Sequence, residues 1–240
     1  MTQPDNWSEK QQILVILAHP DDPEFFCGGT LARWAQAGHE IKYVLLTCGD
    51  KGRNPHNHHT ADEELCAQRH IEQRAAADVL GVGAIQFMGL PDGYLIPSLE
   101  LRRDIVRVIR QLKPDVLVTC DPQNLFAVYG INHPDHRATG QVVLDAVFPA
   151  AGNDLFFPEL LTEGLAPHTP KEVWVSLTNQ PNISIDITEH FETKIRAIWQ
   201  HQSQLGDPDP LDKRLRSRHT EDSTDETPRY EEKFRVINWR

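Results

Sequence analysis

An unbroken apolar run, Ile-Leu-Val-Ile-Leu-Ala, occupies residues 13–18. A strand with one face in water alternates apolar and polar residues, so a run without alternation indicates a strand buried on both faces. Strands of this kind belong to parallel sheets, in which helices cover both sides. The run therefore predicts a sheet enclosed between layers of helix.

Strand-like and helix-like segments alternate after this run. Further strands are expected at 41–47, 84–88 and 114–120, and helices at 24–37, 62–81, 98–113 and 132–147. Ser98 and Asn132 are candidate N-caps of the last two helices. Strands that alternate with helices imply right-handed crossovers, and hence an α/β fold with a mostly parallel sheet flanked by helices.

The pattern changes after residue 150. Two further strands, "EVWVSL" and "NISIDIT", precede a late helix at 189–205, and "KFRVINW" is expected to return as a strand. The polar segment 206–232 is expected to be irregular, and residues 1–12 a loose N-terminal arm. We interpret residues 1–240 as a single α/β domain with a C-terminal extension of strands and a late helix.

The charge balance limits the partners. Lysine and arginine number 24, and aspartate and glutamate 35, so the formal net charge is −11. An acidic surface argues against nucleic acid and anionic membranes as partners, and no apolar run approaches the length of a membrane span. The scattered cysteines contain no Cys-x-x-Cys pair, which suits a reducing compartment rather than a disulfide framework. With a polar N-terminus that lacks a signal peptide's apolar core, these features predict a soluble cytoplasmic protein.

Two polar clusters follow expected strands. The first, His19-Pro-Asp21-Asp22, ends the strand at 13–18, and the second, His133-Pro-Asp-His136, follows the loop after the strand at 114–120. Ligands of open α/β sheets bind at the carboxyl ends of the strands, so both clusters belong on one rim. Within each cluster, residues three apart share one face at the start of a helix. The clusters are therefore expected to converge.

These residue types suit a divalent metal. Imidazoles and a carboxylate are common ligands, and a catalytic zinc keeps three protein ligands and a water. Asp21 could then stay off the metal beside Asp22 and act as a base on that water, whose pKa falls to about 7 in such sites. Either motif alone could be an ordinary turn or helix start. Both together, each at a strand end, favour a metal site.

The paired motifs also carry a family resemblance. "AHPDD" at 18–22 followed by "HPDH" at 133–136 resembles the PIG-L (LmbE-like) family of zinc-dependent N-deacetylases, and the segments at 47–52, 69–82, 90–95 and 201–204 agree. The similarity covers most of residues 13–205. It implies a Rossmann-like fold and hydrolysis of an N-acetyl group from an N-acetylglucosamine-type sugar or a related small conjugate. It also makes a homo-oligomer plausible.

The resemblance further implies how the two clusters work together. It assigns one Zn²⁺ per chain, with other divalent metals possible, to His19, Asp22 and His136. It makes Asp21 the general base and His133 the group that stabilises the oxyanion or acts as the acid.

Two more positions match sugar-hydroxyl contacts in some family members. These are Arg69 and Asp92. The alternative for Arg69 is a surface ion pair with Glu72, three residues along the helix, and the alternative for Asp92 is a turn residue in Pro-Asp-Gly.

Other functions are also possible from the sequence. One is an amidase acting on a thiol-sugar conjugate, a second is a non-catalytic nucleotide-binding α/β module, and a third is an inactive scaffold. The absence of a Gly-x-Gly-x-x-Gly fingerprint counts against the second. The sequence leaves open the role of a histidine-rich loop, which contains His56, His58 and His59. It also leaves open the roles of Tyr129 and of His201, which lies on the expected late helix.

Overall fold

The computed structural model describes residues 5–52, 62–127 and 130–239. Its centre is a seven-stranded sheet in the order β3-β2-β1-β4-β7-β9-β8. The first five of these strands are parallel, and β9 runs antiparallel to both β7 and β8. The bounds are β1 Gln12–Leu17, β2 Glu40–Thr47, β3 Ala84–Leu90, β4 Val116–Cys120, β7 Glu172–Ser176, β8 Ile183–Asp186 and β9 Glu231–Asn238. The mostly parallel sheet expected from the sequence is confirmed.

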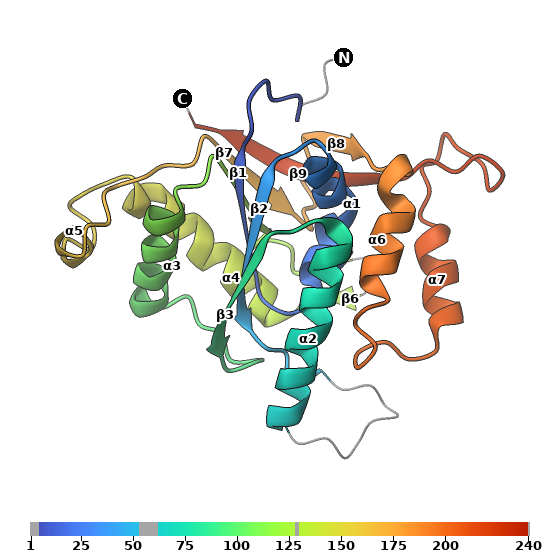
Figure 1. Cartoon of the computed structure of the whole chain (residues 1–240), viewed down its shortest axis with the longest axis horizontal. Helices are drawn as coiled ribbons and strands as arrows, with labels where there is room; N and C mark the ends of the chain where they lie inside the picture. Colours follow the sequence, from blue (N-terminus) through green and yellow to red (C-terminus); the bar gives the residue numbers. More distant parts are fainter. Residues whose placement is uncertain (1–4, 53–61, 128–129, 240) are drawn as a thin grey trace.

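Helices cover both faces of the sheet (Figure 1). One face packs against α1 (Asp22–Gln36), α2 (Asp62–Leu80) and α6 (Phe191–Ile198), and the other against α3 (Leu99–Leu112), α4 (Pro134–Asp145) and η1 (Ala146–Ala151). Along β1, Val15 and Leu17 belong to the first core, whereas Leu14 and Ile16 belong to the second. All four side chains are buried, which explains why the run carries no polar alternation.

Short elements complete the fold. They are the hairpin β5 (Phe126–Ala127) and β6 (Gly130–Ile131), α5 (Glu159–Thr162), η2 (Thr188–His190) and α7 (Pro208–Arg216). Helix α7 lies inside the segment that the sequence led us to expect as irregular. Asp207 caps its N-terminus by accepting from the Asp209 N–H, and Leu215 anchors it in the core. Two apolar positions, Leu211 and Leu215, fix this short helix although most of its residues are polar.

Helix α1 bends at Cys27, whose φ of −149° interrupts the helical backbone. The bend leaves the next N–H groups without intrahelical partners. The Glu232 carboxylate, which arrives from β9, accepts from the N–H groups of Gly29 at 3.0 Å and Thr30 at 2.8 Å. Lys194 of α6 pairs with the same carboxylate at 2.6 Å. A residue distant in sequence thus caps the second half of the helix.

Other boundaries differ from the expected ones. Helix α4 begins at Pro134 with His133 as its N-cap, not Asn132. The late helix ends at Ile198, seven residues short of the expected boundary at 205. The described part of the N-terminal arm is packed rather than loose, because the buried Asp5 carboxylate accepts from the indole of Trp34 at 3.0 Å. Ser98 is the N-cap of α3, as expected, and accepts from the Leu101 N–H.

A disulfide joins Cys48, just after β2, to Cys66 on α2. The cysteine spacing argued against disulfides, and for this pair the expectation is wrong, because the two residues meet only through the crossover between the strand and the helix. Cys27 and Cys120 are free and buried. In the ranges that the structure describes, every helix is too short or too polar to cross a membrane.

Candidate metal centre

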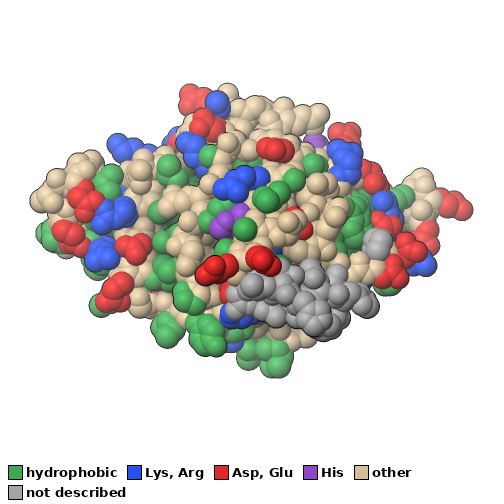
Figure 2. Space-filling view, turned by 60° about the horizontal axis from the view of Figure 1, so that its bottom comes forward, with side chains coloured by type: hydrophobic (Ala, Val, Ile, Leu, Met, Phe, Trp, Pro, Cys, Tyr) green, Lys and Arg blue, Asp and Glu red, His purple; other side chains and the backbone are tan. Residues whose placement is uncertain are grey.

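The two polar clusters meet at the middle of the sheet's carboxyl edge. Strands β1 and β4 are neighbours, and the chain builds the sheet outward in one direction from β1 and in the other from β4. Such a switch point leaves a crevice for ligands. His19 follows β1 and the His133–His136 cluster begins α4, so both clusters flank this crevice. Figure 2 turns this side of the molecule toward the viewer and shows a histidine side chain at the surface between basic and acidic groups.

Three side chains place their donor atoms against one another. His19 Nδ1 lies 3.2 Å from His136 Nε2, and 3.4 Å from Asp22 Oδ2. His136 Nε2 lies 3.0 Å from Asp22 Oδ1. Zinc–nitrogen and zinc–oxygen bonds of about 2.0–2.1 Å in a tetrahedron put neighbouring ligand atoms about 3.3 Å apart. Asp22 faces the two histidines with different oxygens, and the spacing and the chemistry of the three side chains fit the ligand set of a divalent ion.

Each histidine of the trio also has a polar neighbour at its other nitrogen, within ion-pair distance for His19 and at hydrogen-bond distance for His136. His19 Nε2 lies 3.1 Å from the Asp92 carboxylate and 3.4 Å from that of Asp135. His136 Nδ1 lies 2.9 Å from the Asn132 amide oxygen. Such outer partners fix the tautomer and the ring orientation of metal-binding histidines. Both rings therefore aim one nitrogen at the common point.

The close contacts between these ionisable groups shift their pKa values. Burial alone would lower the pKa of His19, yet that pKa lies well above its usual value because Asp22, Asp135 and Asp92 surround the ring. Burial alone would raise the pKa of Asp22, yet His136 and His19 hold it far below its usual value. Burial would also raise the pKa of Asp92, but contact with His19 lowers it to about 2. The cluster is a carboxylate-rich site, which favours a cation.

Two other trios also come close enough to hold an ion: His19 with His133 and His136, and His19 with Asp92 and Asp135. In the first, His133 already uses Nδ1 to accept from the Asp135 N–H at 3.2 Å. In the second, Asp135 accepts from the backbone N–H groups of Gly93 and Leu95. Asp22 also accepts from a backbone N–H, that of His19 at 2.9 Å, but its two oxygens contact both histidine nitrogens, so we favour the trio that contains Asp22.

Asp21 lies beside the cluster in an unusual backbone conformation. Its φ is 89°, a region that costs a residue with a side chain about 1–2 kcal/mol. The Gln73 amide oxygen accepts from its N–H at 2.8 Å, and the Arg69 guanidinium donates to its carboxylate at 3.1 Å. Burial raises the pKa of Asp21 while Arg69 opposes the shift. The turn thus separates the two adjacent aspartates, because Asp22 faces the histidines and Asp21 faces Arg69.

A buried network of polar side chains holds the turn at Asp21 in place. The Gln73 amide nitrogen donates to both oxygens of Glu24, at 3.0 and 3.1 Å, and His201 Nε2 lies 3.1 Å from the same carboxylate. Gln73, Glu24 and His201 are fully buried. His201, whose role the sequence left open, is therefore buried against Glu24 rather than on the surface.

Arg69 is held by the chain on two further sides. Its guanidinium donates to the carbonyl oxygens of Gly49 and Pro20, each at 2.6 Å. The Arg69–Glu72 ion pair considered from the sequence does not form, because Glu72 accepts from Ser203 and Gln68 instead. Asp92 likewise contacts the chain, through His19 and the Lys51 N–H at 2.9 Å. Both residues nevertheless line the cavity, so a substrate contact stays a prediction for each.

The structure adds residues to which the sequence analysis gave no role in the site. Asp135 and Asn132 orient the histidines, and Gln73 and Glu24 hold the turn. Asp135 lies inside the second motif, and Gln73 lies one turn after Arg69 on α2, so position alone could have suggested both. Tyr129 and the histidine-rich loop fall outside the described residues.

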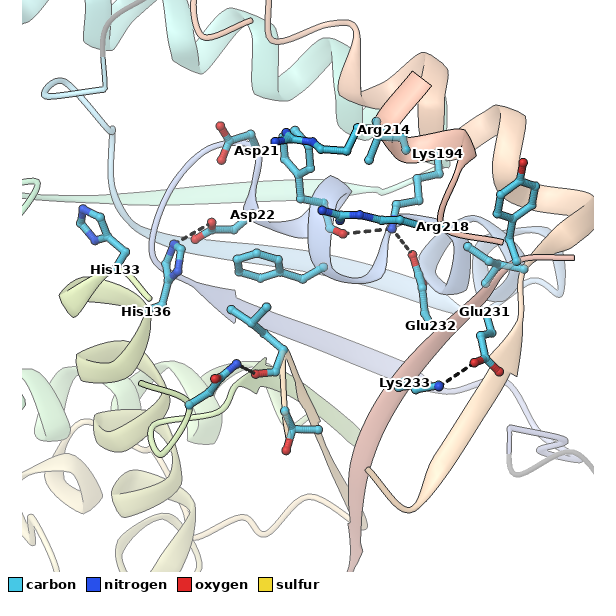
Figure 3. A pocket seen from close by; sticks show the side chains of 18 of the residues that line it. Asp21, Asp22, His133, His136, Lys194, Arg214, Arg218, Glu231, Glu232 and Lys233 are labelled. Carbon is cyan, nitrogen blue, oxygen red and sulfur yellow. Dashed lines mark hydrogen bonds and ion pairs between the residues drawn. The ribbon is translucent and has the colours of Figure 1, made fainter. Parts of the chain in front are cut away.

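A cavity of about 1390 Å³ opens at this site. All five residues of the proposed metal and acid–base groups line it, together with Phe25 and Phe26 of α1; the five are His19, Asp21, Asp22, His133 and His136. Figure 3 shows Asp22 facing His136 at one end of the cavity, with His133 beside them. Ligand sites are typically about 300–1,000 Å³, so the volume suits more than one sugar ring.

Comparison with known proteins gives a consistent result. Residues 14–147 match the model of a family described as PIG-L, GlcNAc-PI de-N-acetylase. The diacetylchitobiose deacetylase of Thermococcus kodakarensis is 33% identical over 199 residues, which cover 83% of this chain and 72% of that protein. A Bacillus anthracis protein named "Probable N-acetyl-alpha-D-glucosaminyl L-malate deacetylase 2" is 30% identical over 200 residues, with 82% of each chain covered.

A solved structure has the same fold. The N,N'-diacetylchitobiose deacetylase of Pyrococcus horikoshii, in complex with an inhibitor, superposes with a TM-score of 0.86 at 31% identity. The match covers 96% of this chain and 85% of that one.

Proposed function

This chain belongs to the PIG-L family, and from that membership together with the geometry of the cluster we propose that it is a zinc-dependent N-deacetylase of an N-acetylglucosamine-type sugar conjugate. Hydrolytic N-deacetylation itself follows from the family and its relatives. The non-catalytic module and the inactive scaffold are therefore set aside. The metal's identity, the residue roles and the substrate are proposals.

The observation that carries the proposal is the mutual contact of three side chains at the end of the cavity, where His19 Nδ1, His136 Nε2 and the two oxygens of Asp22 lie 3.0–3.4 Å from their neighbours. His19, Asp22 and His136 would hold the ion. A bound zinc would polarise the acetyl carbonyl and lower the pKa of a water molecule.

Asp21 supplies the base. Its carboxylate lines the cavity without contacting the histidines, and burial raises its pKa toward the range of a useful base. It takes the proton from the attacking water and returns it to the departing amine. Arg69 holds the carboxylate in place from the other side.

His133 supplies a hydrogen bond to the developing oxyanion. Because its Nδ1 accepts from a backbone N–H, the proton of the neutral ring is on Nε2. Burial and the charges of His19 and His136 lower the pKa of His133, which favours this neutral form. One such donor contributes about 3–4 kcal/mol to stabilising the transition state.

The test combines metal analysis with acetate release. Purified protein is assayed for bound metals and for acetate released from N-acetylglucosamine, N,N'-diacetylchitobiose and a sugar-thiol conjugate. We expect about one zinc per chain, and loss of most metal and activity in His136→Ala. His190→Ala, which removes an imidazole outside the cavity, serves as the control and should keep both. Full metal retention in His136→Ala would remove His136 from the ligand set.

The same screen addresses the amidase alternative. Cleavage of a thiol-sugar conjugate at an amide other than the acetyl group, without acetate release, would favour that function. A cytoplasmic location and a homo-oligomer stay predictions from the sequence.

A further inference from the structure

The cavity extends well beyond the metal cluster, toward α7 and β9. Arg214 and Arg218 line this distal part together with the ion pairs Lys194–Glu232 and Lys233–Glu231. Figure 3 shows the guanidinium groups of both arginines extending from α7 and the residues after it toward the side of the cavity where Asp21 and Asp22 lie. The distal part and the metal cluster therefore share one space.

The charged side chains of the distal part differ in their pairing. Lys194 lies 2.6 Å from Glu232, and Lys233 lies 2.7 Å from Glu231. Arg216, between the two arginines in sequence, is paired with Glu192 and Asp212. By contrast, the guanidinium groups of Arg214 and Arg218 form no ion pair or hydrogen bond with any residue in the described ranges.

The two unpaired charges are also close enough to repel each other. Partial burial, followed by the charge of Arg214, lowers the pKa of Arg218, and no carboxylate opposes this effect. The chain carries 35 acidic against 24 basic residues, so acidic partners are plentiful. Of the carboxylates between α7 and β9 that line the same cavity, Asp222 pairs with Arg229 and Glu221 forms no ion pair with either arginine. Two neighbouring cations without a carboxylate partner, inside a ligand cavity, leave a site for an external anion.

The helix dipole of α7 is an alternative explanation for the position of the two arginines. Basic residues in a helix's last turn interact favourably with its dipole. Lys213 and Arg216 are in that turn as well, yet neither lines the cavity. Arg218 lies beyond the last helical residue. The dipole therefore does not account for two guanidinium groups turned toward the cavity.

We propose that Arg214 and Arg218 bind a negatively charged substituent, a carboxylate or a phosphate, on the N-acetylated sugar conjugate that this enzyme deacetylates. The guanidinium fork matches both groups through paired hydrogen bonds. A cavity of about 1390 Å³ has room for such a substituent beyond the sugar ring. The inference rests on the proposed N-deacetylase function and narrows its substrate class.

The test compares three derivatives of N-acetylglucosamine that differ in the group on the anomeric oxygen. They are the neutral methyl glycoside, the carboxymethyl glycoside and N-acetylglucosamine 1-phosphate, with kcat/KM measured by acetate release. We expect at least one charged substrate to exceed the neutral one by about tenfold or more. In the double variant Arg214→Gln/Arg218→Gln, the ratio of charged to neutral kcat/KM should fall about 10- to 100-fold, the effect of losing charge-assisted hydrogen bonds. Which charged substrate loses more distinguishes carboxylate from phosphate.

Lys213→Gln is the matched control, because it removes one positive charge from the same helix outside the cavity. Its charged-to-neutral ratio should equal that of the parent protein. An unchanged ratio in the double variant, or a parent enzyme that prefers the methyl glycoside, would overturn the proposal.

Binding measurements separate this proposal from the proposed function. If the parent protein releases acetate from no substrate, the deacetylase assignment fails. Calorimetry with N-acetylglucosamine 1-phosphate and with the carboxymethyl glycoside then decides whether the anion site exists. A loss of affinity of at least tenfold for either in the double variant, absent in Lys213→Gln, supports the site, and equal affinities refute it.

Discussion

Glu232 holds the bend of α1, so replacing it with glutamine should destabilise the protein strongly. Its carboxylate accepts from Lys194 at 2.6 Å, from Thr30 at 2.8 Å and from Gly29 at 3.0 Å. Lys194 also donates to the carbonyl oxygen of Phe25 at 2.9 Å, on the other side of the bend. Lysine and glutamate together thus satisfy both interrupted ends of the helix, and both residues are buried.

The size of the effect follows from these contacts. An amide has one acceptor oxygen, so Glu232→Gln loses at least one of the three hydrogen bonds, each worth about 1.5–3 kcal/mol with a charged partner. It also leaves the Lys194 ammonium buried without a counter-charge, and breaking a buried pair costs about 3–5 kcal/mol. Because the two figures describe the same contacts, we expect a loss of about 3–5 kcal/mol in the free energy of unfolding. For a chain of this length that corresponds to a Tm about 6–20 °C lower.

The assay is urea unfolding followed by circular dichroism, with thermal unfolding alongside. Glu231→Gln is the control, because this neighbour on β9 is exposed and pairs with Lys233 on the surface, where a pair contributes about 0–1 kcal/mol. A Glu232→Gln variant within 1 kcal/mol of Glu231→Gln would refute the reasoning, because it would show that the bend does not depend on the charge.

Two further predictions concern the residues around the metal site. Asp21→Asn should retain zinc and lose about 10²–10⁴-fold in kcat, since it removes basicity alone. Asp22→Asn should lose both zinc and activity, because an amide is a weaker zinc ligand than a carboxylate. Metal content and acetate release are measured on both variants, and the reverse pattern would exchange the roles of the two residues. Arg69→Ala should lower kcat more than it raises KM, because the guanidinium holds Asp21. A rise in KM at unchanged kcat would instead indicate the sugar contact predicted from the sequence.

Much of the fold could be predicted because it depends on local patterns. The unbroken run at 13–18 predicted a doubly covered strand, and Leu14 and Val15 indeed face two different cores. Ser98 predicted a helix start that its side chain caps. Likewise, the two motifs predicted convergence, because parallel strands place their carboxyl ends on one edge.

Other features depend on contacts between distant segments, which no local pattern encodes. Helix α7 forms in a polar stretch because Leu211 and Leu215 pack against the core. Cys48 and Cys66 are brought together by the crossover between β2 and α2. The bend at Cys27 needs a carboxylate that arrives more than two hundred residues later, from Glu232.

Some features of the site follow from the sequence, and others depend on the tertiary structure. The sequence by itself determined which residue types could bind a metal and which two motifs would share an edge, because ligand chemistry and strand direction are local properties. Tertiary structure alone decided that Asp22 faces the histidines while Asp21 faces Arg69, that Gln73 supports their turn, and that two arginines face the cavity. Those arrangements depend on side-chain directions and on elements that meet only when the chain has folded.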